Sequence, residues 1–328
     1  MKSVLASLGL VGLAVAESRT SAPSGCVTVS SSGGDYTTIQ DAVDSFSTSS
    51  SEAQCIFINA GTYSEQVLVS ARSAQMTIYG YTSDTSSYSG NKVTITSSLS
   101  QADGLSNDET ATLRVKADNF KLYNVNVNNG YGSGSQAVAL SAYAASGYYG
   151  VQLTGFQDTL LAQTGNQIYA NSLIQGGTDF IFGQNAPAWF ENVDLRVLTA
   201  SSGYVTANGR SSSSGTSYYV FNNCDIAAAS GNTVSSGAYY LGRPWGAYAR
   251  VTFQNTAMSS VINSAGWAIW NTDDERTSNV EFDEYNNSGT GSEGTRASFA
   301  TKLSSAVSIS TVLGSSYSSA GYYDSSYM

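Results

Sequence analysis

Histidine is absent from all 328 residues of this sequence. Its absence excludes a Ser-His-Asp hydrolase and any metal site built on imidazole ligands. Proline is rare, with 3 residues, and charged residues make up only 12% of the chain, whereas Gly (32) and Tyr (22) are plentiful. No acidic cluster has the spacing of a metal-binding loop, so we expect no metal and no other cofactor. The composition is typical of a β-rich protein with uncharged turns.

Basic residues and long apolar runs are also scarce. Only 14 Lys and Arg residues stand against 24 Asp and Glu residues, so the chain lacks the basic face that a nucleic acid partner requires. Residues 1–16 carry one positive charge, a short apolar run and a small-x-small ending, which is typical of a cleaved secretory signal peptide. No later segment approaches the length needed to span a membrane. The sequence predicts a secreted, extracellular protein with a single domain over residues 17–328.

The chain has only three cysteines, an odd number for an oxidising compartment. We favour a disulfide between Cys26 and Cys55, which leaves Cys224 free. The alternative is three unpaired, buried thiols. One sequon, Asn286-Asn287-Ser288, is a candidate site for an N-linked glycan.

Several segments repeat one pattern, in which an asparagine stands between two apolar residues. The asparagines of five copies are Asn124, Asn171, Asn192, Asn223 and Asn255. The wide first gap has room for a further copy at residues 149–154, in which Gly150 takes the asparagine position. A repeat of just over 20 residues made of short strands predicts an all-β parallel β-helix with stacked, hydrogen-bonded asparagines. The alternative is a chance pattern in an Asn-rich β-sandwich.

The two ends of such a solenoid must be covered. Residues 36–47 have apolar side chains at helical spacing behind two threonines, which predicts a short capping helix at the first turn of the solenoid. Residues 296–307 are a candidate for a second capping helix at the other end.

Two acidic residues have equivalent positions in neighbouring repeats. Asp158 lies eight residues after Gly150, and Asp179 lies eight residues after Asn171. Because neighbouring strands are about 4.8 Å apart, the two carboxyl groups are expected side by side on one outer face. Two such groups resist ionising together, so one stays ionised while the other keeps its proton. The ionised group can act as a nucleophile and the protonated group as a proton donor. The alternative is a pair of structural turn aspartates held by backbone amides.

Further candidates have weaker signals of their own. Arg243, in "LGRPW", is suited to hold one aspartate ionised through a bidentate contact, although an isolated arginine is more often a surface residue. Gln136 and Gln157 carry amides that can donate to an oxyanion, although such glutamines are usually only solvated. Three tryptophans either form a platform for sugar rings or fill the core: Trp245, Trp267 and Trp270.

Taken together, the motifs resemble the pectin methylesterase family of carbohydrate esterases. They occur in the family's order, cover nearly all of residues 27–312, and are as follows: "GTYSEQV" at 61, "SQAVAL" at 135, "GFQDTL" at 155, "GGTDFIFG" at 176, "LGRPW" at 241, "GWAIW" at 266 and "EFDEYNNSG" at 281. The resemblance implies a right-handed parallel β-helix and the hydrolysis of C6 methyl esters of polygalacturonate to carboxylates and methanol. It also implies a monomer whose partner is methyl-esterified pectin.

The resemblance also assigns roles to residues of this chain. It implies that Asp179 is the nucleophile, that Asp158 is the general acid and then the base, and that Arg243 orients Asp179. Gln136 and Gln157 would stabilise the oxyanion. Three further residues are expected to bind the substrate: Trp245, Trp267 and Tyr63.

This sequence departs from the family pattern at three positions, and none of these departures removes a catalytic group. Ser141 stands in place of a common Arg, Leu161 in place of a common Tyr, and Thr178 in place of a common Val. Two other functions remain as alternatives. One is a pectin depolymerase on the same fold, and the other is a non-catalytic carbohydrate-binding solenoid.

Overall fold

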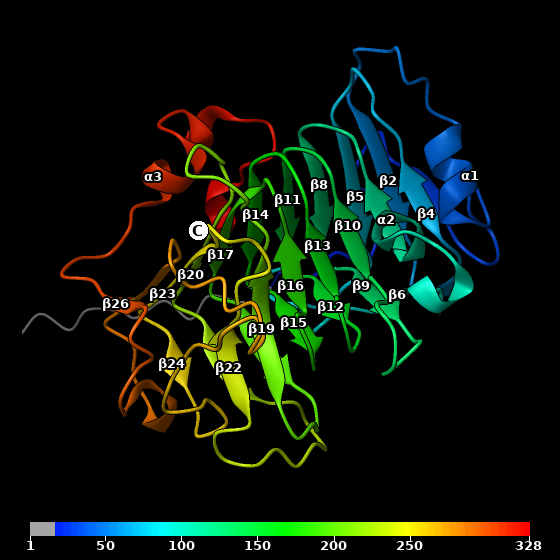
Figure 1. Cartoon of the computed structure of the whole chain (residues 1–328). Coiled ribbons are helices and arrows are strands. Elements are labelled where there is room, and N and C mark those ends of the chain that lie inside the picture. Colours follow the sequence, from blue (N-terminus) through cyan, green and yellow to red (C-terminus); the bar gives the residue numbers. More distant parts are fainter. Residues whose placement is uncertain (1–16) are drawn as a thin grey trace, which may run out of the picture.

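The computed structural model of the chain describes residues 17–328, and the predicted signal peptide, residues 1–16, lies outside them. Short strands stack into three long parallel sheets that run the length of the molecule (Figure 1). The chain passes from one sheet to the next in each rung, so the predicted parallel β-helix is confirmed. Within residues 17–328, no helix is long and apolar enough to cross a membrane.

The strands of each sheet follow one another along the axis of the β-helix. The eleven-stranded sheet consists of β1 (Val27–Val29), β2 (Gln54–Ile58), β5 (Met76–Gly80), β8 (Phe120–Tyr123), β11 (Ser146–Tyr149), β14 (Gln167–Ala170), β17 (Pro187–Glu191), β20 (Tyr218–Asn222), β23 (Arg250–Gln254), β25 (Glu281–Tyr285) and β26 (Ala300–Lys302). The eight-stranded sheet consists of β3 (Gly61–Ser64), β6 (Val93–Ser97), β9 (Asn126–Asn129), β12 (Gln152–Thr154), β15 (Leu173–Gly176), β18 (Asp194–Val197), β21 (Asp225–Ala228) and β24 (Ala257–Met258). The seven-stranded sheet consists of β4 (Val67–Val69), β7 (Leu113–Val115), β10 (Leu140–Ala142), β13 (Leu160–Ala162), β16 (Ile181–Gly183), β19 (Gly203–Asn208) and β22 (Tyr239–Gly242).

Helices are short and few. The α-helices are α1 (Ile39–Asp44), α2 (Asn107–Thr110) and α3 (Ile309–Leu313), and the 3-10 helices are η1 (Gln101–Asp103), η2 (Thr290–Ser292), η3 (Tyr317–Ser319) and η4 (Ser325–Tyr327). The predicted N-terminal cap is confirmed as α1, which begins after the N-cap Thr38 and contacts β1, β2 and β4. Its apolar face, Ile39, Ala42 and Val43, is buried against the first rung.

The repeated asparagines share an unusual backbone conformation. Their φ angles lie between 49° and 54°, in the left-handed region that asparagine tolerates better than most residues. Gly150 has the same conformation at φ 58° and has no room for a side chain, because a Cβ there would lie 2.6 Å from the Asn124 amide nitrogen. The column therefore exists because each rung turns sharply at this point.

The predicted hydrogen bonding along the asparagine column is only partly confirmed. Asn192 donates to Asn171 at 2.8 Å, and Asn286 donates to Asn255 at 2.9 Å. Other members bind neighbouring groups instead, as where Asn223 donates to Glu191 at 2.8 Å. The ladder is interrupted there, because Asn223 binds the carboxylate of Glu191 on strand β17.

Aromatic rings stack through the core along the eleven-stranded sheet. Tyr148, Tyr169, Phe190, Phe221 and Phe253 lie on successive rungs, with neighbouring ring centroids 4.3–4.8 Å apart. In the next rung, the residue that pairs with Phe253 is Glu284 rather than an aromatic residue. The column continues outside this register, because Phe253 contacts Trp267, with ring centroids 5.9 Å apart, and Trp267 stacks on Phe282 at 4.3 Å.

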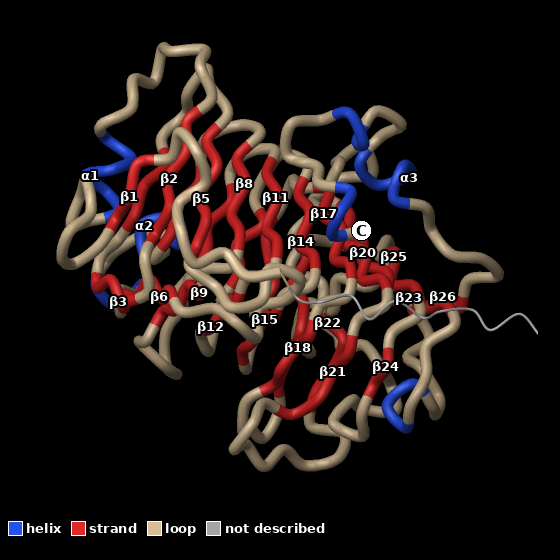
Figure 2. The backbone as a smooth tube through the Cα atoms, turned by 180° about the vertical axis from the view of Figure 1, so that it is seen from behind, coloured by secondary structure: helices blue, strands red, loops and turns tan. Residues whose placement is uncertain are grey.

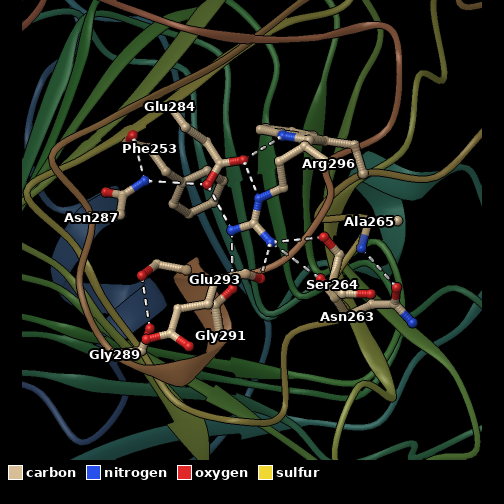
Figure 3. Close-up of polar contacts among 12 residues, drawn as sticks. Phe253, Asn263, Ser264, Ala265, Glu284, Asn287, Gly289, Gly291, Glu293 and Arg296 are labelled. Atoms are coloured by element: carbon tan, nitrogen blue, oxygen red, sulfur yellow. Dashed lines mark hydrogen bonds and ion pairs between the residues drawn. The ribbon is translucent and has the colours of Figure 1, made fainter.

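A partly buried ion pair lies at this C-terminal end of the core. Arg296 donates two hydrogen bonds to Glu284, at 2.8 and 2.9 Å, and its remaining N–H groups bind backbone carbonyls of nearby loops (Figure 3). The second capping helix predicted over residues 296–307 is wrong. This segment contains β26 instead, which pairs with β25 because the last sheet edge would otherwise leave its backbone groups without partners.

The C-terminal segment crosses the outer face of the eleven-stranded sheet. Helix α3 contacts β17 and β20, and the view from behind shows α3 beside this sheet (Figure 2). Val312, Leu313 and Tyr322 pack there against outward-facing apolar residues of the sheet. The predicted disulfide between Cys26 and Cys55 is present. Cys26 directly precedes β1, Cys55 lies in β2, and both stand one position before the pair Val27 and Ile56. Cys224 is free and buried.

Candidate active site

Asp158 and Asp179 lie in the turns that lead from the eight-stranded to the seven-stranded sheet. A backbone bridge between Gln157 and Thr178 aligns the two turns, so the two acids occupy equivalent positions on adjacent rungs, as predicted. The same offset of 21 residues relates β12 to β15 and β13 to β16. Both acids have a left-handed backbone, with φ 65° and 48°, and their exposed fractions are only 6% and 7%.

Tight packing around the turn explains the paired glycines of "GGTDF". A Cβ on Gly176 would lie 2.2 Å from the Cβ of Phe180, and a Cβ on Gly177 would lie 2.8 Å from the ring of Phe156. Only glycine fits at these two positions, because either contact is shorter than a real Cβ allows. The glycines let the turn close over the apolar residues that follow Asp179.

Arg243 binds Asp179 through two parallel hydrogen bonds. Its Nε donates to Oδ1 at 2.9 Å and a terminal nitrogen donates to Oδ2 at 2.7 Å, which confirms the predicted bidentate contact. The guanidinium lies between two aromatic rings, 4.2 Å from the centroid of Tyr204 and 4.4 Å from that of Trp270. These contacts hold the arginine in one orientation.

The environment separates the pKa values of the two acids. Burial raises the pKa of Asp158 well above its ordinary value, and the negative charge of Asp179 raises it further. Burial also raises the pKa of Asp179, but the hydrogen bonds and the charge of Arg243 oppose that effect. Asp158 therefore keeps its proton to higher pH than Asp179, and between the two pKa values only Asp179 is ionised.

The acids open into a pocket of about 300 Å³ on the seven-stranded sheet. Its lining includes most of the predicted residues and some that sequence reasoning missed: Gln101, Asn107, Gln136, Gln157, Asp158, Asp179, Phe182, Ala207, Arg243, Trp245 and Trp270. A larger cavity of about 500 Å³ lies at the C-terminal end beside Glu284 and Arg296. We place the site in the smaller pocket, because the two charged residues of the larger cavity, Glu284 and Arg296, already form an ion pair with each other.

Gln136 and Gln157 lie side by side in this pocket. The amide N–H of Ala137 donates to the carbonyl of Gln157, which sets the two glutamines on adjacent rungs. Among the described residues, neither side-chain amide has a hydrogen-bond partner. Both amides are therefore free to donate to a group bound beside the acids.

Two residues that were expected to contact the substrate lie in the core instead. Trp267 is 1% exposed, stacks on Phe282 at 4.3 Å and donates to the Glu284 carboxylate at 3.2 Å. Tyr63 is 7% exposed and donates its hydroxyl to the carbonyl of Asn59 at 2.9 Å. Neither residue lines the pocket, so both expectations are wrong.

Trp245 and Trp270 are the tryptophans that line the pocket. The Trp245 ring lies against Gly209, where a Cβ would come within 2.6 Å of it, so this glycine makes room for the indole. The motif "GWAIW" indicated two tryptophans without distinguishing them. The backbone of Trp267 pairs with Gly242 and its side chain is buried, whereas Trp270 lines the pocket. Tyr204 belonged to no motif, and only the stacking of rungs brings it to Arg243.

The departures from the family pattern lie on the same face. Leu161 is buried in an apolar cluster with Phe182 and Ala207, and Trp245 packs against that cluster. Ser141 is fully buried and donates to Asp108 at 2.8 Å. All the side chains predicted to be catalytic line the pocket: Gln136, Gln157, Asp158, Asp179 and Arg243.

The fold and the pocket together define a parallel β-helix protein whose pocket holds two adjacent carboxyl groups. Comparison with known proteins gives the family. The pectinesterase family model matches residues 26–312. A pectinesterase from Aspergillus aculeatus is 55% identical over 100% of this chain and 99% of its own length, and one from Aspergillus niger is 52% identical over the same shares. The chain belongs to the pectinesterase family and is a carboxylic ester hydrolase.

Solved structures agree with this assignment. The pectin methylesterase of Aspergillus niger in deglycosylated form superposes with a TM-score of 0.88 at 44% identity, over 95% of this chain and 100% of that one. The pectin methylesterase from carrot superposes with a TM-score of 0.81 at 27% identity, over 93% of this chain and 98% of that one.

Proposed function

We propose that this pectinesterase hydrolyses the C6 methyl esters of homogalacturonan with Asp179 as nucleophile and Asp158 as general acid and base. The single observation that carries the proposal is the asymmetry of the acid pair. Arg243 binds Asp179 at 2.7 and 2.9 Å but makes no hydrogen bond to Asp158, within the part of the chain that the structure describes. One acid is thus prepared as an anion and its neighbour as a proton donor.

The first chemical step forms an acyl-enzyme. The Asp179 carboxylate attacks the C6 carbonyl carbon, and the carbonyl oxygen becomes an oxyanion that accepts hydrogen bonds from Gln136 and Gln157. The C6–O bond to the methoxy group then breaks, and neutral Asp158 gives its proton to the departing oxygen. The products of this step are methanol and an anhydride between Asp179 and the galacturonate.

The second step restores the enzyme. Asp158, now ionised, takes a proton from a water molecule, whose oxygen attacks the C6 carbonyl carbon of the anhydride. The bond to Asp179 breaks, which returns Asp179 to its ionised state and releases the C6 carboxylic acid, and this acid then loses its proton to the solvent. The apolar residues beside Asp179, Phe180 and Phe182, limit access of other water to the anhydride.

The setting of this reaction belongs to the same proposal. We infer that the protein is secreted and acts as a monomer on methyl-esterified pectin, with no membrane or nucleic acid partner. The disulfide between Cys26 and Cys55 supports an oxidising compartment.

Replacement of Asp179 tests the proposal. Asp179→Asn keeps a residue that tolerates φ 48°, so we expect an unchanged melting temperature within a few degrees and retained pectin binding. Methanol release from esterified pectin should fall to background, because the amide is not a nucleophile. The control is Asp225→Asn, which removes an exposed ion pair with Arg196 at 2.7 Å, away from the pocket, and should keep turnover.

The same experiment separates the two alternative functions. Near-normal methanol release by Asp179→Asn would refute the assigned nucleophile. Wild-type protein that produces new reducing ends or unsaturated products without methanol would be a depolymerase. Wild-type protein that binds pectin without any product would be a carbohydrate-binding solenoid.

A further inference from the structure

Two guanidinium groups contact the ring of Trp270. That of Arg243 lies 4.4 Å from the ring centroid, and that of Arg276 lies 4.9 Å from it. Arg243 binds Asp179, whereas Arg276 does not line the pocket. A cation over an aromatic face is attracted to the ring, so Arg276 restricts the position of Trp270. The ring that holds Arg243 in place is therefore itself held by a second arginine.

Arg276 also binds the loop that carries the other pocket tryptophan. Its Nη1 donates to the backbone carbonyl of Trp245, and its Nε donates to the Asp274 carboxylate at 2.8 Å. A guanidinium can make these contacts together, because it is planar and its N–H groups point in fixed directions. Trp245 stands only two residues after Arg243 in the chain. One side chain thus connects the segment of Arg243 with the ring of Trp270.

The backbone of Arg276 is in the left-handed region, with φ 56°. Within residues 17–328, every other residue with a positive φ is a glycine, an asparagine or an aspartate. An arginine has no short polar side chain to stabilise this conformation, so the surrounding structure must hold it there. Backbone preference alone would favour asparagine or glycine at this position. The contacts of the guanidinium, not the backbone, therefore suit arginine to it.

We propose that Arg276 is a positioning residue for ester hydrolysis, which fixes the Trp270 ring and thereby keeps Arg243 aligned with the nucleophile. This inference rests on the proposed function. The two hydrogen bonds to Asp179, at 2.7 and 2.9 Å, depend on the direction of the planar Arg243 guanidinium. When the Trp270 ring is free to move, Arg243 can turn away, and the Asp179 anion is then stabilised less. Arg276 acts through Trp270 rather than on the substrate itself.

Removal of the guanidinium tests this role. Arg276→Asn keeps a residue that tolerates φ 56°, so its melting temperature should stay within a few degrees of the wild-type value. We expect kcat to fall about two- to fivefold, as the loss of a partly exposed cation–π contact predicts. The acid limb of the pH–rate profile should move to higher pH, because a looser Arg243 stabilises the Asp179 anion less. An unchanged acid limb would overturn the positioning role.

Two further variants separate position from charge. Arg276→Lys keeps the charge but loses the planar group, so its acid limb should also move to higher pH. A wild-type profile for Arg276→Lys would assign the shift to charge alone and overturn the positioning role. Arg196→Asn is the control, because Arg196 has a comparably exposed side chain away from the pocket. It should keep the wild-type profile, and an equal shift in this control would also overturn the role.

A double variant tests whether Arg276 acts through Trp270. In a Trp270→Ala background, Arg276→Asn should lower kcat by less than it does in the wild-type protein, because the ring through which it acts is already gone. Equal effects in the two backgrounds would contradict this route.

A measurement without turnover keeps this inference separate from the catalytic proposal. Carbon NMR titration of the Asp179 carboxyl, assigned by comparison with Asp179→Asn, reports its pKa directly. This pKa should be higher in both Arg276 variants than in the wild-type protein, whether or not the protein releases methanol. An equal pKa in all three proteins would overturn the positioning role. Absence of methanol release from the wild-type protein would overturn the proposed function instead.

Discussion

Asp158 and Asp179 have the same left-handed backbone conformation on adjacent rungs, with φ 65° and 48°. The asparagine column has this conformation as well, at φ 49–54°. In both places a short polar side chain stands where the chain turns sharply between two sheets. The same left-handed conformation thus occurs at two kinds of turn. At one it carries the asparagine column, and at the other it places two carboxyl groups side by side in a pocket.

The buried Asp158 should make the stability of the protein depend on pH. Burial raises its pKa in the folded state, so the folded state binds the proton more tightly than the unfolded state does. The resulting stability is fully present below the unfolded pKa of about 3.9 and is lost as the pH rises through the folded pKa. Asp158→Asn should remove this loss, so we expect wild-type stability to fall relative to the variant between pH 4 and pH 7.

Denaturant unfolding of the two proteins across this range measures the effect, whose slope is at most about 1.4 kcal/mol per pH unit. Asp35→Asn is a contrasting variant, because hydrogen bonds from Thr28 lower the pKa of Asp35. Its stability deficit should shrink as the pH falls. A wild-type curve parallel to that of Asp158→Asn would contradict the raised pKa of Asp158.

Trp270 should act as a positioning residue through Arg243. Trp270→Ala removes one of the two rings that hold the guanidinium, and a cation–π contact of about 0.5–2 kcal/mol predicts a fall in kcat of about 2- to 30-fold. A looser Arg243 stabilises the Asp179 anion less, so the acid limb of the pH–rate profile should move to higher pH.

Trp270→Phe should restore the position of the acid limb, because a phenyl ring retains a π face for the guanidinium. A rise in KM with an unchanged pH profile would indicate that Trp270 only contacts the sugar. The experiment requires only methanol release measured over pH for the three proteins.

The asparagine column should be sensitive to side chains that disfavour a positive φ. Asn192 has φ 51°, and alanine in that conformation costs about 1–2 kcal/mol. Asn192→Ala should therefore lower the free energy of unfolding by more than Asn192→Gly, although both lose the hydrogen bond to Asn171. Chemical denaturation of the two variants measures the difference, and equal stabilities would show that the hydrogen bond, not the backbone, selects asparagine.

Local patterns were sufficient to predict the β-helix, the helix over α1 and the register of the two acids. The register of the two acids was predictable because their two rungs are offset by 21 residues in all three sheets, so equal spacing along the chain becomes adjacency in space. The motifs also identified the glutamines and Arg243. They failed for residues 296–307, whose apolar spacing suited a helix while the open edge of β25 required a strand.

The sequence by itself determined the repeat, the turns and the identity of the two acids, because these depend on backbone preferences and spacing within one or two rungs. Only the tertiary structure decided which aromatic residues face the pocket. Trp267 turned inward to fill the space above Phe253, while Trp270 and Tyr204 met around Arg243 from distant parts of the chain. The direction of a side chain at the end of a stack depends on the core volume that its neighbours leave unfilled. The local sequence does not determine that volume, because the neighbours come from other rungs.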